Sequence, residues 1–196
     1  MEKRNKRELQ AEQTYQKLLA TSVDMIVKKG YDNVSISEIC SRCDVAKGTF
    51  YTYFNSKKDI VIKILADINK EIFNKDWDIS LPIFDRIIEY IDCYMGSIQC
   101  QGADFTRVFL KIIMDEKLDV ESVGAHKHRI HVAKIIDSGK EKGVVRGDLE
   151  TNEICRYLQG YIYGIMIDWC GADGDYDIVK YGKKAVSGFL DMLRPG

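Results

Sequence analysis

Apolar residues recur every three or four positions along most of this 196-residue chain, which is the spacing of one buried helix face. The first such run extends from Thr14 to Lys29 and is followed by Gly30, a residue type that commonly ends helices. Residues 1–13 are polar, and we expect a flexible arm there. Strand-like alternation is missing, so the pattern predicts an all-α fold of about nine helices. The later helices are expected over about 36–43, 46–54, 57–74, 82–98, 105–113, 121–142, 151–170 and 177–193.

Residues 35–57, which we call the helix-turn-helix segment, contain two short predicted helices joined by a tight turn. Ser35, followed three residues later by Glu38, predicts a capping box at the start of the first helix. Asp44 can adopt the left-handed conformation that the turn needs, at more strain than glycine would carry. The second helix, over 46–54, is small, basic and aromatic. This combination is typical of a helix-turn-helix, whose second helix lies in the major groove of DNA.

The polar residues of this segment can each be given a role in DNA binding. Lys47 and Thr49 stand at the helix start, where side chains reach base edges or phosphates, and Gly48 lets the backbone approach DNA closely. The tyrosine hydroxyls can donate hydrogen bonds to phosphate oxygens. Lys57 adds charge and exposed N–H groups at the start of the following helix. Two side chains are expected to point inward and hold the helix in place: Phe50 and Phe54.

Charge is distributed unevenly along a chain whose net charge is −1. Residues 1–58 carry 11 Lys and Arg against 7 Asp and Glu, a net of +4, whereas the remainder carries 18 against 23, a net of −5. This contrast suggests that the N-terminal portion meets a polyanion. The N-terminus lacks the apolar stretch of a signal peptide, and no apolar run reaches the ~18 residues of a membrane span. We therefore expect a cytoplasmic protein with no membrane partner.

A set of residues at fixed spacing runs through about 14–65: Leu18-Leu19, Gly30-Tyr31, Ser35-Ile36, Ile39-Cys40, Asp44-Val45, Lys47-Gly48-Thr49-Phe50-Tyr51, Tyr53-Phe54 and Lys57. This set resembles the tetracycline-repressor (TetR) family of bacterial transcription regulators. The resemblance implies a three-helix DNA-binding domain over 1–56, followed by a helical domain over 57–196 that dimerises and usually binds a small effector. Asp44 and Ala46 depart from the pattern, since they stand where glycine and a capping serine are common. The missing cap at Ala46 costs about 1 kcal/mol of helix stability.

The resemblance also assigns residues to two contact surfaces. It implies that the DNA-facing residues are Ser35, Lys47, Gly48, Thr49, Tyr51, Thr52, Tyr53 and Lys57. In the family, the last two helices form a four-helix bundle with those of a second copy. Glycine gaps on these helices could serve a contact within the chain, but the resemblance favours the approach of the partner. It assigns to a homodimer interface Gly160, Gly164, Gly182 and Phe189.

Aromatic and sulfur-containing side chains are abundant in the C-terminal portion, where each of them alone also fits a plain core. As a set they suit an apolar, adaptable pocket formed by Cys93, Tyr94, Met95, Phe105, Phe109, Met114, Tyr161, Met166 and Trp169. No dense array of charges accompanies them, which favours an uncharged or aromatic effector. We therefore predict a homodimeric repressor that releases operator DNA when a small molecule binds.

Two clusters leave a thiol- or metal-sensing regulator with the same DNA-binding segment as the alternative. Cys40 and Cys43 have the spacing of half a zinc site, but without a second such pair we favour packing as small buried side chains. His128 and His131, close to His126, could share a metal on one helix face. Basic residues between them oppose a bound cation, so we favour a solvated helix start. A nucleophile–base–acid set and a phosphate loop are both missing, so we expect neither an enzyme nor a cofactor.

Overall fold

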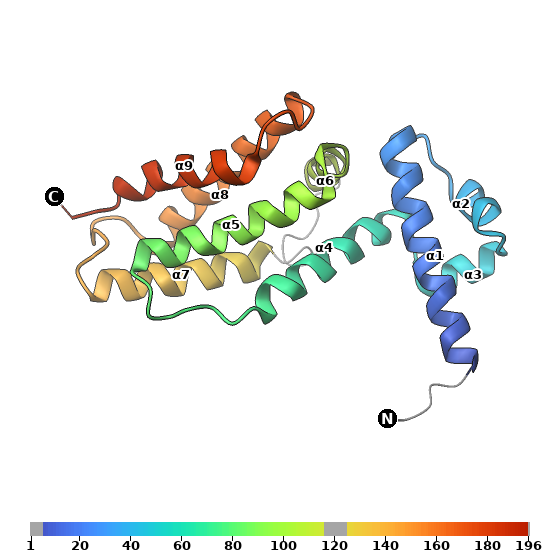
Figure 1. The fold of residues 1–196 in the computed structure, drawn as a ribbon, viewed down its shortest axis with the longest axis horizontal. Helices are drawn as coiled ribbons and strands as arrows, with labels where there is room; N and C mark the ends of the chain where they lie inside the picture. The colour runs from blue at the N-terminus through green and yellow to red at the C-terminus, as the bar shows by residue number, and fades with distance from the viewer. Residues whose placement is uncertain (1–5, 116–124, 196) are drawn as a thin grey trace. The chain divides into compact units, whose positions relative to one another are not determined.

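The computed structural model describes residues 6–115 and 125–195. Within these ranges the chain forms nine α-helices and no strand, which confirms the predicted all-α class (Figure 1). The helices are α1 Lys6–Lys29, α2 Ile36–Cys43, α3 Lys47–Tyr53, α4 Lys57–Asn74, α5 Ile83–Gln101, α6 Ala103–Asp115, α7 Ala125–Glu141, α8 Thr151–Gly171 and α9 Ile178–Asp191. None of these described helices combines the length and the apolar character needed to cross a membrane.

The first helix starts earlier than its apolar pattern indicated. We expected a flexible arm over 1–13, but α1 begins at Lys6, and residues 6–13 are helical although exposed. Glutamate, leucine, glutamine and alanine are all good helix formers, so propensity extends α1 without burial. The helix predicted over 121–142 begins at Ala125 in the described residues, and residues 121–124 lie outside them.

The chain divides into two compact units, residues 1–65 (unit 1) and 66–196 (unit 2). In unit 1, α1 packs against α2, and α2 packs against α3. The core of unit 1 contains Leu18, Met25, Ile26, Val34, Ile39, Cys40, Cys43, Phe50, Phe54, Ile60 and Val61. Helix α4 begins in unit 1 and continues into unit 2. The functional division at residue 56 stays a prediction, and it falls at the start of this helix.

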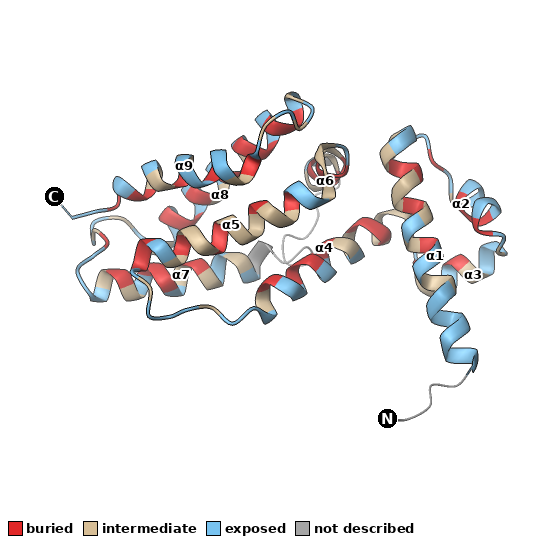
Figure 2. Cartoon of the chain, viewed as in Figure 1, coloured by how far each residue is buried: buried red, intermediate tan, exposed pale blue. Residues whose placement is uncertain are grey.

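Helix α5 is the central element of unit 2, where it packs against α6, α7 and α9 (Figure 1). Helix α8 completes the bundle by packing against α6, α7 and α9. Figure 2 shows the buried residues as stripes along these helices, with exposed residues on the outer faces. The largest fully buried side chains of unit 2 are Tyr90, Ile87, Met95, Ile112, Ile136, Ile154 and Met166.

Candidate nucleic-acid interface and effector domain

The turn between α2 and α3 has the backbone conformation predicted from its sequence. Asp44 is the C-cap of α2, with φ 55° and ψ 50° in the left-handed region. Its N–H and that of Val45 donate to carbonyl oxygens near the end of α2, at 3.2 and 3.0 Å. Ala46 is the N-cap of α3 and gives no side-chain hydrogen bond. The turn is therefore tight, and the first turn of α3 lacks its cap.

The outward side of α3 carries several of the groups predicted to meet DNA. Lys47, Gly48, Tyr51 and Thr52 are exposed, with 54% of Tyr51 accessible, while Thr49 is half-buried. A Cβ at Gly48 would meet no atom within 4 Å, so the backbone is open to an approaching molecule. The hydroxyl of Thr52 already donates to the carbonyl oxygen of Gly48 at 3.0 Å. The strongest outward features of α3 are thus the Lys47 charge and the Tyr51 hydroxyl.

The inward side of α3 is held by aromatic rings. Phe50 and Phe54 are buried as predicted, with ring centroids 5.5 Å apart. Tyr15 of α1 stacks on Phe54, with centroids 5.5 Å apart. Tyr53 donates its hydroxyl hydrogen to the carbonyl oxygen of Ala11 at 3.0 Å. The predicted phosphate contact of Tyr53 therefore competes with a contact already made inside unit 1.

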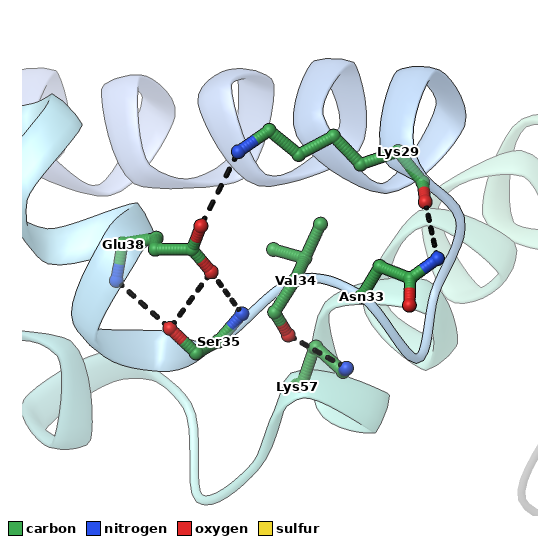
Figure 3. Close-up of polar contacts among 6 residues, drawn as sticks. All are labelled: Lys29, Asn33, Val34, Ser35, Glu38 and Lys57. Atoms are coloured by element: carbon green, nitrogen blue, oxygen red, sulfur yellow. Dashed lines mark hydrogen bonds and ion pairs between the residues drawn. The ribbon is translucent and has the colours of Figure 1, made fainter.

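Ser35 closes the predicted capping box at the start of α2 (Figure 3). Its Oγ accepts from the Glu38 N–H at 3.2 Å, and Glu38 Oε2 accepts from the Ser35 N–H at 2.8 Å. Lys29 Nζ lies 3.2 Å from Oε1 of the same carboxylate. Hydrogen bonds from the backbone and hydroxyl of Ser35, and then from Lys29, lower the pKa of Glu38 to about 2. Ser35 remains exposed, but its hydroxyl is engaged in the cap.

Two lysines of unit 1 direct their ammonium groups at main-chain carbonyl oxygens. Lys57 Nζ donates to Val34 O at 2.7 Å (Figure 3). It also donates to Tyr31 O and lies 4.2 Å from the centre of the Tyr31 ring. Lys17 Nζ donates to Cys43 O at 2.8 Å, at the end of α2. Lys57, assigned to a phosphate from the sequence, is therefore half-buried against the turn between α1 and α2.

The cysteines of α2 belong to the core of unit 1. Cys40 and Cys43 are buried free thiols. Burial, with a smaller contribution from Cys43, raises the pKa of Cys40, which makes its reactive thiolate form scarcer. Among the described side chains, no group of three or more His, Cys, Asp or Glu could hold a metal ion. These observations give no support to the thiol- or metal-sensing alternative.

The residues predicted to form an effector pocket separate into an interior and a surface set. The interior contains Met95, Phe105, Phe109, Met166 and Trp169, with Cys93 and Tyr94 half-buried. Met114 is 66% exposed and Tyr161 is 44% exposed, so these two side chains lie at the surface. Trp169 also has a structural partner, because its Nε1–H donates to Tyr176 O at 2.8 Å. The pocket stays a prediction.

A polar network around His128 joins three helices of unit 2. His128 Nε2 lies 2.6 Å from Asn69 Oδ1 on α4, and Nδ1 makes a short contact with the Tyr90 hydroxyl on α5. The His131 ring stacks on Tyr90 with centroids 4.3 Å apart. Burial, with a smaller contribution from His131, lowers the pKa of His128 to about 4. His128 is therefore neutral at pH 7, and the expected solvated helix start is wrong for it.

One feature of the sequence could have indicated that His128 and His131 face the interior. Positions 128, 131, 132 and 135 share one helix face, and Val132 and Ile135 on that face are buried. The partners could not be inferred, since Tyr90 and Asn69 precede His128 by 38 and 59 residues. The side chain of His126, the third histidine of the predicted cluster, lies outside the described residues.

Helices α8 and α9 carry an exposed surface with two glycine gaps. A Cβ at Gly160 or Gly164 would meet no atom within 4 Å. Both line a surface hollow together with Tyr161, Ile165, Asp168, Tyr181 and Ala185. Tyr161 stacks on Phe189 with centroids 5.9 Å apart. Gly182 differs, because a Cβ there would lie 3.3 Å from Met95 Cγ of the same chain. The absence of a side chain at Gly182 allows α9 to approach α5 of the same chain. This corrects the prediction that Gly182 forms a gap for a partner subunit.

Two family models match the chain. The model described as bacterial regulatory proteins of the tetR family matches residues 18–64, which include α2, α3 and the turn between them. The model of the C-terminal region of MAATS-type transcriptional repressors matches residues 109–195. The chain belongs to the TetR family of bacterial regulatory proteins. The resemblance seen in its motifs is thereby confirmed.

Individual relatives of this TetR-family chain differ in how much of it they cover. The TetC protein of transposon Tn10 from Escherichia coli is 34% identical over 100 residues, which span 46% of this chain and about half (51%) of TetC. A probable acrEF/envCD operon repressor from E. coli strain K12 is 21% identical over the whole chain and 92% of its own length. A putative transcriptional regulator from Saccharomonospora viridis, solved in complex with choline, is 22% identical with a TM-score of 0.70, over 92% of this chain and 96% of that one. The last likeness concerns the fold alone.

Proposed function

We propose that this chain is a transcriptional repressor that binds operator DNA through α3 and releases it when a small molecule binds unit 2. The observation that carries this proposal is the two-sided character of α3. Lys47, Gly48 and Tyr51 are exposed, while Phe50 and Phe54 are buried behind them. A helix packed on one side against the core, with a charged and a hydroxyl-bearing side chain exposed on the other, suits the major groove of DNA.

We further propose that two copies associate through α8 and α9. Large side chains are exposed along these helices and just after α9: Tyr157, Tyr161, Ile167, Tyr181 and Met192. Exposed apolar surface of this kind often marks a contact with another protein. A two-fold pair would present two copies of α3 to successive major grooves of a pseudo-palindromic site. Sedimentation should then give twice the 22.5 kDa chain mass, and Gly164→Arg should yield monomers.

The effector site in this proposal lies in unit 2, and the effector is uncharged or aromatic. The interior of unit 2 supplies apolar rings and sulfur atoms, among them Met95, Phe105 and Phe109. A protein with this fold has been solved with the small organic molecule choline, which supports a small-molecule ligand. An effector can shift DNA binding only by the difference in its affinity for the two states.

The remaining parts of the proposal follow from DNA binding. We assign residues 1–56 to DNA recognition and 57–196 to effector binding and dimerisation. A regulator of this kind acts in the cytoplasm, where bacterial DNA lies, and it needs no enzymatic activity. The two family models, which match 18–64 and 109–195, support a two-part organisation, and the first of them extends past residue 56 into α4.

A gel-shift titration with the DNA that flanks its own gene tests the central claim. Lys47→Ala and Tyr51→Ala should each weaken binding about tenfold or more, because each removes a contact to DNA. Both side chains are exposed, so the thermal unfolding curve should change little. Lys28→Ala is the matched control, because Lys28 is an exposed lysine of α1 that pairs with Asp24. Unchanged binding by both α3 variants would overturn the proposal.

A further inference from the structure

Lys57 is the first residue of α4, the helix that begins in unit 1 and continues into unit 2. Its ammonium group points toward the α1–α2 turn, where it donates to Val34 O at 2.7 Å (Figure 3) and also to Tyr31 O. The same group lies 4.2 Å from the centre of the Tyr31 ring. An ammonium group has three N–H donors, and two of them serve these carbonyl oxygens. By contrast, Lys47 on α3 is exposed.

The turn that Lys57 contacts leads directly into α2. Val34 is 2% exposed and anchors the turn in the core, and Ser35 after it is the N-cap of α2. On the other side, Asn33 Nδ2 donates to Lys29 O, the last residue of α1, at 2.9 Å. A connected set of polar contacts therefore joins the end of α1, the start of α2 and the start of α4 (Figure 3).

The main chain around Lys57 is also fixed. Asn55 N–H donates to Asp59 Oδ2 at 2.8 Å, and Asp59 N–H donates to Ser56 Oγ at 3.3 Å. These bonds close the first turn of α4 in the manner of a capping box. Lys57 thus connects the hydrogen-bonded start of α4 to the hydrogen-bonded α1–α2 turn. Its side chain therefore couples the position of α4 to the position of that turn.

We propose that the Lys57 side chain is a positioning residue for DNA binding and not a phosphate contact. It fastens α4 to the α1–α2 turn and thereby sets the angle at which α2 and α3 meet DNA. The inference rests on the proposed DNA-binding function. A phosphate contact releases counterions and steepens the dependence of binding on salt, whereas a residue that only orients helices does not. Orientation matters most where base edges are read, so its loss weakens specific binding more than nonspecific binding.

The test compares salt dependence and specificity in full-length variants. The wild-type protein first selects a DNA duplex from a random-sequence library. Binding to this duplex and to an unrelated duplex is then measured between about 50 and 200 mM salt, well below the melting temperature of each variant. Lys57→Met should bind the selected duplex about tenfold more weakly, with the salt slope unchanged and less than about a twofold change on the unrelated duplex. Lys47→Met should instead reduce the slope by about 1, and Lys28→Met should change neither quantity.

A second variant keeps the charge of Lys57 and removes the Tyr31 ring, beside which the ammonium group lies. Tyr31→Leu should reproduce the loss of specificity at unchanged slope, and it carries the test if Lys57→Met does not fold. A slope reduced by about 1 in Lys57→Met, with both duplexes weakened equally, would show a phosphate contact and overturn the inference. Unchanged binding by Lys57→Met, or tighter binding of both duplexes by Tyr31→Leu, would overturn it as well. A wild-type protein that selects no duplex would overturn the proposed function, and the inference with it.

Discussion

The capping box of unit 1 and the His128 network of unit 2 differ in how far apart their members lie along the chain. In unit 1 many polar contacts lie at helix starts and join residues close in sequence, as in the exposed pair of Ser35 and Glu38, three positions apart. In unit 2 the half-buried His128 joins Tyr90 and Asn69, which are 38 and 59 positions away. Local contacts shape single helix ends, whereas a network across α4, α5 and α7 holds only while each member keeps its partner. The stability of unit 2 should therefore depend more on its polar side chains.

The largest effect is expected from the apolar anchor of unit 1. Phe50→Ala should lower the free energy of unfolding by about 3–5 kcal/mol, because it removes a fully buried ring and leaves a cavity. Chemical denaturation followed by circular dichroism measures this loss. The neighbouring Tyr51→Ala is the control and should change stability by about 0.5 kcal/mol or less, since its side chain is exposed. Similar losses in both variants would contradict the two-sided character of α3.

Breaking the polar network should have the next largest effect. His128→Leu should destabilise unit 2 by about 2–4 kcal/mol, because it removes the contacts of His128 with Asn69 Oδ1 and with the buried Tyr90 hydroxyl. The unit 1 counterpart, Ser35→Ala, should cost only about 1 kcal/mol. Replacing the whole network, with Asn69→Leu and Tyr90→Phe added, should recover much of the loss. If His128→Leu left the stability of unit 2 unchanged or raised it, the two units would not differ in how strongly their stability depends on polar side chains.

The two units should also respond to acid in different pH ranges. The pKa of His128 falls from 6.5 to about 4, chiefly through burial, so the unfolded chain takes up a proton that the folded chain excludes. The contribution of neutral His128 to the free energy of unfolding is complete above pH 6.5 and is lost as the pH falls toward 4. The pKa of Glu38 is lowered from 4.5 to about 2, chiefly by the Ser35 hydrogen bonds, so its contribution persists down to pH 4.5 and is lost below. As the pH falls, unit 2 should therefore lose stability before unit 1.

Tryptophan fluorescence offers a direct measurement, because both tryptophans, Trp77 and Trp169, lie in unit 2. The urea midpoint that they report should fall between about pH 7 and pH 5. His131, whose pKa burial also lowers, acts in the same direction. In His128→Leu the pH dependence over this range should become shallower. A wild-type midpoint that stays constant from pH 7 to pH 5 would exclude the proposed role of His128.

The sequence predicted the turns and helix starts of unit 1 well because their signals are local. The capping box at Ser35 and the left-handed Asp44 depend on neighbours within a few positions, and both are confirmed. The directions of long side chains depend on distant segments instead. Lys57 and Tyr53 were assigned outward, but they contact Val34 and Ala11, which are 23 and 42 positions away. Spacing along a helix indicates which face a residue occupies and does not identify the partner across it.

The smallest effect concerns Ala46, the uncapped start of α3. In unit 2, α9 is capped by Asp177, whose side chain accepts from Lys180 N–H, whereas α3 has no such bond. Ala46 already has the extended N-cap conformation, with φ −70° and ψ 151°, so a serine there needs no change of backbone. Ala46→Ser should therefore stabilise unit 1 by about 1 kcal/mol, measured by chemical denaturation with hydrogen exchange at α3 amides. Ala20→Ser, in the middle of α1, is the control and should destabilise slightly. If Ala46→Ser gives no gain, the first turn of α3 does not limit the stability of the helix-turn-helix segment.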